Sequence, residues 1–277
     1  MTIIAGFKCN EGIVLCADTQ ETVGTMKRNV PKLRLEPSEG WAGENDGNSL
    51  AVAFCGAGNG PFIDKLVETC WQSAKSAQSA GQACQAIEQS IRDHYAQFGK
   101  IFQPGYCPHA ELIFGVKMWG ESMLFSADGP TVNEVNGYRS SGVGQYMADF
   151  LASRMYGYYL TIHQCVILSA YILFQAKEHV DGCGGESHIA VLREQGKSGL
   201  VEWVRVNAIT ELVGSSDLEL GRLLLQTANI EASDEQFRSR YKVVRKILEK
   251  FRKHHRIELK KWGGASAALS GNTALSG

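Results

Sequence analysis

The second residue of the chain, Thr2, is the first candidate for chemistry. It follows Met1, and removal of a methionine that precedes a small residue would leave a threonine whose free α-amino group lies beside its own hydroxyl. An α-amine has an unperturbed pKa of about 8, so it can accept the hydroxyl proton at neutral pH. A single residue would then supply both a nucleophile and its general base.

Two charged residues farther along the chain are placed to assist this threonine. Asp18 ends an apolar run at 13–17, and Lys32 stands at the start of the next apolar element. The runs 2–8 and 12–18 flank a short turn, which predicts a β-hairpin that returns Asp18 to Thr2. A nearby lysine lowers the pKa of a nucleophile, and a carboxylate holds that lysine charged and oriented. The plainer interpretation is an ordinary aspartate at a strand end and a solvated lysine.

The rest of the chain must supply the framework that holds these groups together. Further strands are expected at 49–55, 110–118, 122–127, 131–134, 187–192 and 199–204, and helices at 62–79, 82–98, 145–158 and 161–179. Strand runs that alternate with helix pairs indicate an α/β (α+β) fold. The prediction is a four-layer αββα sandwich of two antiparallel sheets covered by helices.

Composition limits the class of protein. The chain has 277 residues, of which 44% are hydrophobic and 21% charged, as in ordinary folded domains. No apolar run approaches the roughly 20 residues of a membrane span, and the N-terminus does not resemble a secretory signal. The protein is therefore expected in the cytoplasm. Eight cysteines without zinc-site spacing are expected to be reduced thiols, with no structural metal.

Charge is concentrated near the C-terminus. Residues 238–261 hold eleven Lys/Arg and two acids, which leaves 17 bases against 27 acids in the rest of the chain. Apolar residues recur there at helical spacing, as Phe237, Tyr241, Val244, Leu248 and Phe251. This predicts a basic helix that packs on the body or docks an acidic partner or a neighbouring subunit. It carries no recognised nucleic-acid motif, so nucleic acid is not an expected partner.

The expected domain organisation follows from these patterns. Residues 2–206 form the main domain, 207–262 a helical, basic extension and 263–277 a flexible tail that contains no charged residue.

Three segments near the N-terminus resemble a known family. They are TIIAGFK at 2–8, GIVLCADTQ at 12–20 and MKRNVPKL at 26–33. Together they resemble the opening of a proteasome β-type subunit, and most of all the bacterial two-ring proteasome-like peptidase. The resemblance implies the αββα fold of the N-terminal-nucleophile hydrolases and a self-compartmentalising threonine peptidase built of stacked rings.

The resemblance also implies roles for individual residues. Thr2 would be the nucleophile, Lys32 the cation that lowers its pKa, and Asp18 the partner of that lysine. Gly56, in the segment FCGAG at 54–58, matches a position whose backbone N–H donates to the oxyanion. Thr22 matches a position that pairs its backbone with an extended substrate. Positions that shape the specificity pocket correspond to Glu21, Val30 and Phe54.

Two later segments match the family with departures. SGVGQYMA at 141–148 resembles a Gly-Ser-Gly turn, but a gapless match puts Val143 where a supporting serine belongs, and Ser141 could replace it only with a local shift. DGCGG at 181–185 resembles an Asp-x-x-Ser-Gly-Gly segment, with Cys183 in the serine position and Asp181 one residue too close. We count Ser141, Asp181 and Cys183 among the candidate catalytic residues.

The predicted function is a threonine endopeptidase that acts through an acyl-enzyme on Thr2 and needs no cofactor. Its expected partners are peptide or unfolded protein substrates, further copies of the chain in homo-oligomeric rings, and an ATP-dependent unfoldase or an α-type ring. Two alternatives remain, a non-catalytic ring or scaffold subunit and a small-amide hydrolase of the same superfamily. A Cys183 nucleophile with His179 or His188 is disfavoured because no spacing fixes a dyad.

Overall fold

A computed structural model of the chain describes residues 2–37, 49–101, 108–201 and 203–262. The chain divides into two compact units, Met1–Thr210 and Glu211–Gly277. The domain boundary expected at residue 206 lies within helix α5 (Trp203–Thr227). The flexible tail expected at 263–277 lies outside the described residues. No helix in the described ranges combines the length and the apolar character that a bilayer span requires.

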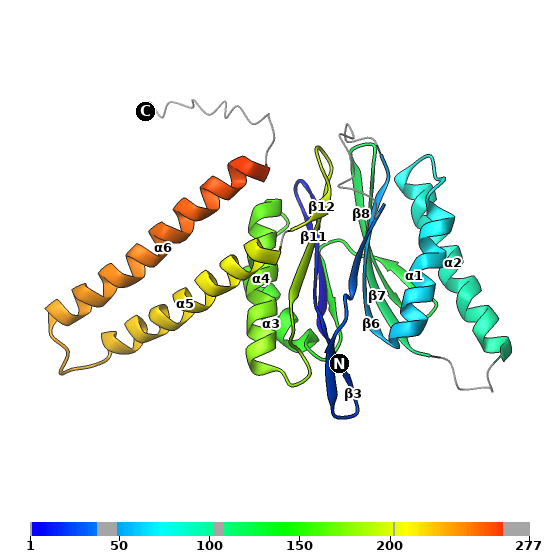
Figure 1. Cartoon of the computed structure of the whole chain (residues 1–277). Helices are drawn as coiled ribbons and strands as arrows, with labels where there is room; N and C mark the ends of the chain where they lie inside the picture. The colour runs from blue at the N-terminus through cyan, green and yellow to red at the C-terminus, as the bar shows by residue number, and fades with distance from the viewer. Residues whose placement is uncertain (1, 38–48, 102–107, 202, 263–277) are drawn as a thin grey trace, which may run out of the picture. The chain divides into compact units, whose positions relative to one another are not determined.

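Two five-stranded antiparallel sheets form the centre of the first unit (Figure 1). In spatial order, the first sheet consists of β10 (Tyr138–Ser141), β1 (Ile4–Cys9), β2 (Gly12–Asp18), β11 (Ser187–Arg193) and β12 (Gly199–Leu200). The second consists of β5 (Leu33–Glu36), β6 (Ala51–Gly58), β7 (Ala110–Met118), β8 (Glu121–Asp128) and β9 (Thr131–Glu134). A separate hairpin is made by β3 (Gln20–Val23) and β4 (Met26–Asn29).

Helix pairs cover the outer faces of both sheets (Figure 1). The helices α1 (Gly60–Ala74) and α2 (Ala80–Ile101) lie on the second sheet, and α3 (Gln145–Met155) and α4 (Ile162–His179) lie on the first. This arrangement confirms the predicted αββα sandwich. Thr161 caps α4, because its Oγ1 accepts a hydrogen bond from Gln164 N at 3.3 Å.

The alternation of side chains on β7 shows how the layers are held together. Leu112 and Phe114 face the helices α1 and α2, whereas Ile113 faces the first sheet. The two sheets pack so closely that a Cβ on Gly115 would lie 2.9 Å from Leu192 Cδ1. Burial of these side chains on both faces of a strand is the main stabilising contribution of the sandwich.

Two parts of the predicted secondary structure differ from the observed fold. The strand expected at 199–204 is wrong beyond β12, because helix α5 begins at Trp203. The sequence of α5 contains β-branched residues and glycines that give it little helical propensity of its own. The strands β3, β4, β5 and β10 were not predicted, because each has only four residues, at least half of them polar or charged.

The second unit is helical. It contains the C-terminal part of α5 and the basic helix α6 (Asp234–Trp262), which confirms the predicted helix at 238–261. Ser233 and Gln236 cap α6, with Gln236 N donating to Ser233 Oγ at 3.3 Å and Ser233 N donating to Gln236 Oε1 at 3.0 Å. Of the apolar residues that recur at helical spacing in this helix, Val244 is buried, whereas Tyr241 and Leu248 are about half exposed.

Candidate active site

The β1–β2 hairpin brings Asp18 to Thr2. The two strands pair with Ile4 opposite Ala17, and Asp18 N donates to Ile3 O at 3.2 Å just beyond the last ladder pair. Both functional side chains are buried, with Thr2 3% exposed and Asp18 fully enclosed. Thr2 Oγ1 donates to Asp18 Oδ1 at 2.5 Å. The pairing predicted from the apolar runs is therefore confirmed, and it places the carboxylate directly on the candidate nucleophile.

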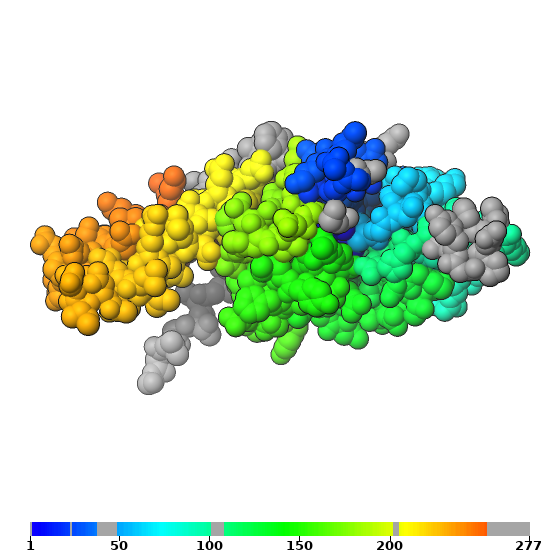
Figure 2. Space-filling view, turned by 90° about the horizontal axis from the view of Figure 1, so that it is seen from below, coloured from blue at the N-terminus to red at the C-terminus, as the bar shows by residue number. Residues whose placement is uncertain are grey.

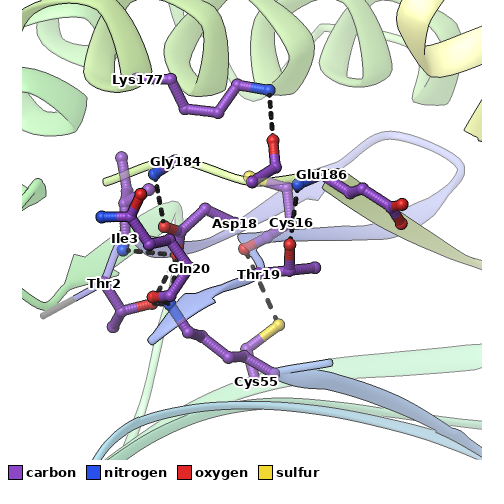
Figure 3. Close-up of polar contacts among 12 residues, drawn as sticks. Thr2, Ile3, Cys16, Asp18, Thr19, Gln20, Cys55, Lys177, Gly184 and Glu186 are labelled. Carbon is purple, nitrogen blue, oxygen red and sulfur yellow. Dashed lines mark hydrogen bonds and ion pairs between the residues drawn. The ribbon is translucent and has the colours of Figure 1, made fainter. Parts of the chain in front are cut away.

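The Asp18 carboxylate accepts four hydrogen bonds (Figure 3). Besides Thr2, Oδ1 accepts from Ile3 N at 3.2 Å and from Lys32 Nζ at 2.7 Å. The other oxygen, Oδ2, accepts from Gly184 N at 2.9 Å. A buried charge is tolerated only when it is paired and hydrogen-bonded, and this set of donors meets both conditions.

Lys32 completes the group. Its Nζ donates to Asp18 Oδ1, to Thr2 Oγ1 and to the carbonyl oxygen of Gln20. Burial lowers the pKa of Lys32 below its usual value, while the Asp18 charge acts in the opposite direction. An ammonium that donates to the threonine hydroxyl favours its deprotonated form, so the geometry can activate Thr2.

A cavity of about 90 Å³ opens beside this group. Thr2 and Lys32 lie at one side of it, and Ile63 and Val67 of α1 contribute apolar surface. The other residues expected at the site that line this cavity are Glu21, Val30, Phe54 and Gly56. The structure thus brings together the residues expected to form a pocket next to the nucleophile.

Gly56 is held by both its backbone and its surroundings. Its N–H donates to the carbonyl of Lys32 at 3.1 Å, so a substrate oxyanion would have to share this donor. A Cβ at Gly56 would lie 2.5 Å from Ile63 Cγ2 in the wall of the cavity. Close packing therefore accounts for a glycine here, apart from any role in an oxyanion hole.

Gly56→Ala is expected to lower the free energy of unfolding by about 1–3 kcal/mol, because the new methyl group must displace Ile63. It should also reduce whatever turnover the cavity supports. Chemical denaturation measures the first effect. Gly81→Ala is the matched control, since no atom lies within 4 Å of the added methyl group, and alanine there should be neutral or stabilise α2 by up to about 1 kcal/mol. Equal stability of the two variants would contradict the packing argument.

Thr22 lies outside the cavity lining. It belongs to β3, where it pairs with Lys27 of β4, and its buried Oγ1 has no hydrogen-bond partner in the described part of the chain. Its expected role in pairing with a substrate backbone stays a prediction.

The structure does not bring Ser141 to the Thr2 hydroxyl. Ser141 pairs with Ile4 across β10 and β1, and its Oγ donates to Glu111 instead. The turn that follows supports Thr2 through its backbone, since Gly144 N donates to Thr2 O at 3.1 Å. Gly142 has a φ of +89°, a conformation that favours glycine. A Cβ added to Gly142 would lie only 2.4 Å from Thr2 O, so no larger residue fits there. The expectation that Ser141 belongs to the hydrogen-bonded group at Thr2 is therefore wrong.

Glu111 belongs to a separate polar cluster with His109 and Asp128, whose ligand-type atoms lie within 4.8 Å of one another. Glu111 and Asp128 are cross-strand partners, and His109 Nε2 lies 3.2 Å from Asp128 Oδ1 and 4.0 Å from Glu111 Oε1. The His109 ring thus lies beside two facing carboxylates. These side chains could also hold a divalent cation, but they lie outside the group around Thr2.

Asp181 is likewise placed differently from the expectation. It is exposed in the turn after α4, and the segment reaches the site through the backbone N–H of Gly184 rather than through the Asp181 carboxylate. A shift of one residue in a turn redirects a side chain completely. Asp181 is therefore not part of the hydrogen-bonded group at Thr2.

Cys183 lies next to the site but lacks the character of a nucleophile. It is buried, and burial raises the pKa of its thiol to about 11, with the Asp18 charge acting in the same direction. A reactive cysteine needs the opposite shift. His188 pairs with Glu186 at 3.5 Å, and His179 is exposed at the end of α4. The described geometry gives no support to a Cys/His dyad.

Three participants were missed by the sequence interpretation. They are the carbonyl of Gln20, which accepts from Lys32, the amide of Gly184, which donates to Asp18, and Lys177 of α4, which contacts the same turn. The first two act through backbone atoms, which carry no residue-type signal. The glycines at 182, 184 and 185 were the one visible indication of a tight turn.

The two helix-covered sheets form a four-layer αββα fold, with Thr2 just ahead of the first strand. Solved structures of Anbu proteins share this fold with the chain. One is an Anbu (Gly-1) mutant from Hyphomicrobium sp. strain MC1, with a TM-score of 0.64 and 15% sequence identity. Another is Anbu (ancestral beta-subunit) from Yersinia bercovieri, with a TM-score of 0.62 and 14% sequence identity. A third is the helical assembly of the Anbu complex from Pseudomonas aeruginosa, with a TM-score of 0.64 and 12% sequence identity.

The structural match extends over 84% of this chain and 99–100% of those proteins. At such low identity the similarity shows the fold alone. No protein-family model and no curated protein matches the sequence.

Proposed function

We propose that the chain is a threonine-type peptidase that hydrolyses peptide bonds through an ester on Thr2 after Met1 is removed. One observation supports this most strongly: the Thr2 hydroxyl is hydrogen-bonded to both Asp18 and Lys32 at the rim of a cavity. A buried threonine with only a structural role would not need an ion pair on its hydroxyl, because burying two charges costs several kcal/mol per ion.

The proposed reaction has two steps. Thr2 Oγ attacks the carbonyl carbon of the peptide bond, and the freed α-amine accepts the hydroxyl proton through a water and passes it to the leaving nitrogen. The C–N bond breaks, and an ester joins the substrate acyl group to Thr2. Water, deprotonated by the same amine, then attacks the ester and releases the acid and the free threonine. Lys32 stabilises the negative charge that develops on Thr2 Oγ, and backbone donors near Gly56 stabilise the oxyanion.

The surroundings of the cavity support an extended substrate. Glu21 of the β3–β4 hairpin and Asp64 of α1 both line the cavity. Figure 2 shows the dark-blue hairpin and the light-blue start of α1 beside one another on the face seen from below, with a recess between them. The β5–β6 pairing ends at Leu33 and Cys55, and Gly56 N still donates to the Lys32 carbonyl. Ala57 and Gly58 at the end of β6 lie beyond these contacts, and a substrate strand would pair along that edge.

The assembly is part of the same proposal. One of the similar structures is titled as a helical assembly of the Anbu complex. We infer that copies of this chain likewise associate into a homo-oligomer that encloses the Thr2 sites. Folded substrates would then need an unfolding partner, such as an ATP-dependent unfoldase, and an α-type ring is the alternative partner. The proposal places this complex in the cytoplasm.

A second candidate function is a non-catalytic subunit of such an assembly. It is favoured by the positions of Ser141 and Asp181, since neither side chain joins the polar group that would support the Thr2 amine.

Incubation of the purified full-length protein with a mixture of unstructured peptides, followed by mass spectrometry of the products, tests the proposal. Internal cleavage by the wild-type chain and none by Thr2→Ala is the expected result. Hydrolysis of small amides without peptide cleavage would favour a small-amide hydrolase. Neither activity in protein that has lost Met1 would favour the non-catalytic subunit.

A further inference from the structure

A second lysine lies on the opposite side of Asp18 from the cavity. Lys177 is in the last turn of α4, and its Nζ donates to Ser187 Oγ at 2.9 Å and to the carbonyl of Gly185 at 3.2 Å. Figure 3 shows its side chain extending from the helix toward the segment that carries Glu186. Lys177 therefore ties the end of α4 to the segment that enters β11.

That segment holds the catalytic group through its backbone. Gly184 N donates to Asp18 Oδ2 at 2.9 Å, and Gly184 O accepts from Gln20 N at 3.1 Å. The carbonyl of Gln20 in turn accepts from Lys32 Nζ. A single residue, Gly184, thus orients both the Asp18 carboxylate and the main chain that positions Lys32.

The turn has too much conformational freedom to hold this geometry by itself. Gly185 has a φ of +71°, and a Cβ at Gly184 would lie 2.3 Å from Gln20 Oε1. Two successive glycines give a flexible backbone that must be fixed by contacts from outside. On the β2 side, Glu186 N donates to Thr19 Oγ1 at 2.7 Å, and on the helix side the contact is Lys177.

We propose that Lys177 is a positioning residue of the Thr2 centre, which fixes the 184–186 turn so that its amide holds Asp18 in place. The inference rests on the proposed peptidase function. Lys177 is not among the residues that line the cavity, and its hydrogen bonds go to Gly185 and Ser187. Its charge also acts on Asp18.

The proposed role has a chemical reason. When the Lys177 donors are lost, the Gly185 carbonyl and the Ser187 hydroxyl must find other partners, and the turn relaxes away from β2. Asp18 then loses the donor to Oδ2 and can rotate, which shifts Lys32 and the Thr2 hydroxyl. Misplacement of a reacting group by about 1 Å can lower the reaction rate by a factor of about 10². Binding of a ligand in the cavity, on the far side of Asp18 from Lys177, is little affected.

The test compares Lys177→Met with Lys177→Arg in the full-length protein. The readout is the rate at which a threonine-directed epoxyketone adds to Thr2, resolved by inhibitor titration into a binding constant and a maximal rate. Lys177→Met is expected to lower the maximal rate about 10- to 100-fold with an unchanged binding constant, and Lys177→Arg to restore most of it. Lys197→Met, at an exposed lysine in the loop between β11 and β12, is the control and should react like the wild type.

Ser187→Ala provides a second variant in case Lys177→Met does not fold. It removes one of the two acceptors of the Lys177 hydrogen bonds, so we expect a smaller loss of maximal rate than in Lys177→Met. When Ser187→Ala is added to Lys177→Met, we expect no further loss of maximal rate. Wild-type rates in Lys177→Met, or in a folded Ser187→Ala if the first variant is unstable, would overturn the inference. A wild-type protein that has lost Met1 and forms no adduct would instead contradict the proposed function itself.

Discussion

Replacing Thr2 with alanine is expected to lower the rate of peptide hydrolysis by at least about 10³-fold, because the variant lacks the only oxygen that can form the ester. The fold should survive. Thr2 Oγ1 contributes hydrogen bonds with Asp18 and Lys32, and loss of such bonds costs about 1–3 kcal/mol, far less than the packing of two sheets contributes. The measurement is peptide turnover, with thermal unfolding measured on the same sample.

Cys183→Ser is the matched comparison for Thr2→Ala. The Cys183 thiol lies close to the same group, but burial holds its pKa at about 11, so it is protonated at neutral pH. The serine variant is expected to keep most of the activity. Loss of activity in Cys183→Ser together with activity in Thr2→Ala would reverse the assignment and identify the thiol as the nucleophile.

Asp18→Asn is expected to cost about 3–5 kcal/mol of stability and to abolish activity, although it changes only one atom type. The carboxylate accepts from Thr2, Ile3 and Lys32 on one oxygen and from Gly184 on the other. The NH2 group of the asparagine would face donors on whichever side it points, so hydrogen bonds are lost on that side. The substitution also leaves the partly buried Lys32 without its counter-charge. Urea denaturation and peptide turnover measure the two effects.

Asp181→Asn is the control for this change. The same substitution at the exposed Asp181 should alter stability by less than about 0.5 kcal/mol. If Asp18→Asn unfolds at the same urea concentration as the Asp181 variant, the hydrogen-bonded network does not stabilise the protein as described.

The framework of the site could be predicted because it depends on patterns that a sequence displays. The apolar runs on either side of residues 9–11 specify a hairpin, and an antiparallel hairpin places Asp18 beside Ile3 and therefore next to Thr2. Helix caps such as Thr161 and long periodic helices are local features as well. The αββα arrangement follows from their order.

The details that failed depend on the geometry of turns. Ser141 is two residues and Asp181 one residue from the position that the resemblance assigns. Near a turn this difference decides whether a side chain meets Thr2, Glu111 or solvent. Gln20 and Gly184 contribute backbone atoms, so no residue type reveals them. Lys177 was not identified because it acts from a helix 159 positions after Asp18, a distance that only the folded chain bridges.

The central claim is that Thr2 is an active N-terminal nucleophile, and intact mass spectrometry of the purified protein tests it most directly. The mass is measured before and after treatment with a threonine-directed epoxyketone, which needs both the free amine and the hydroxyl to form its ring adduct. The predicted result is a protein that lacks Met1 and gains the mass of one inhibitor per chain, with no gain in Thr2→Ala. Protein that lacks Met1 and gains no inhibitor mass, or that gains the same mass in Thr2→Ala, would contradict the claim.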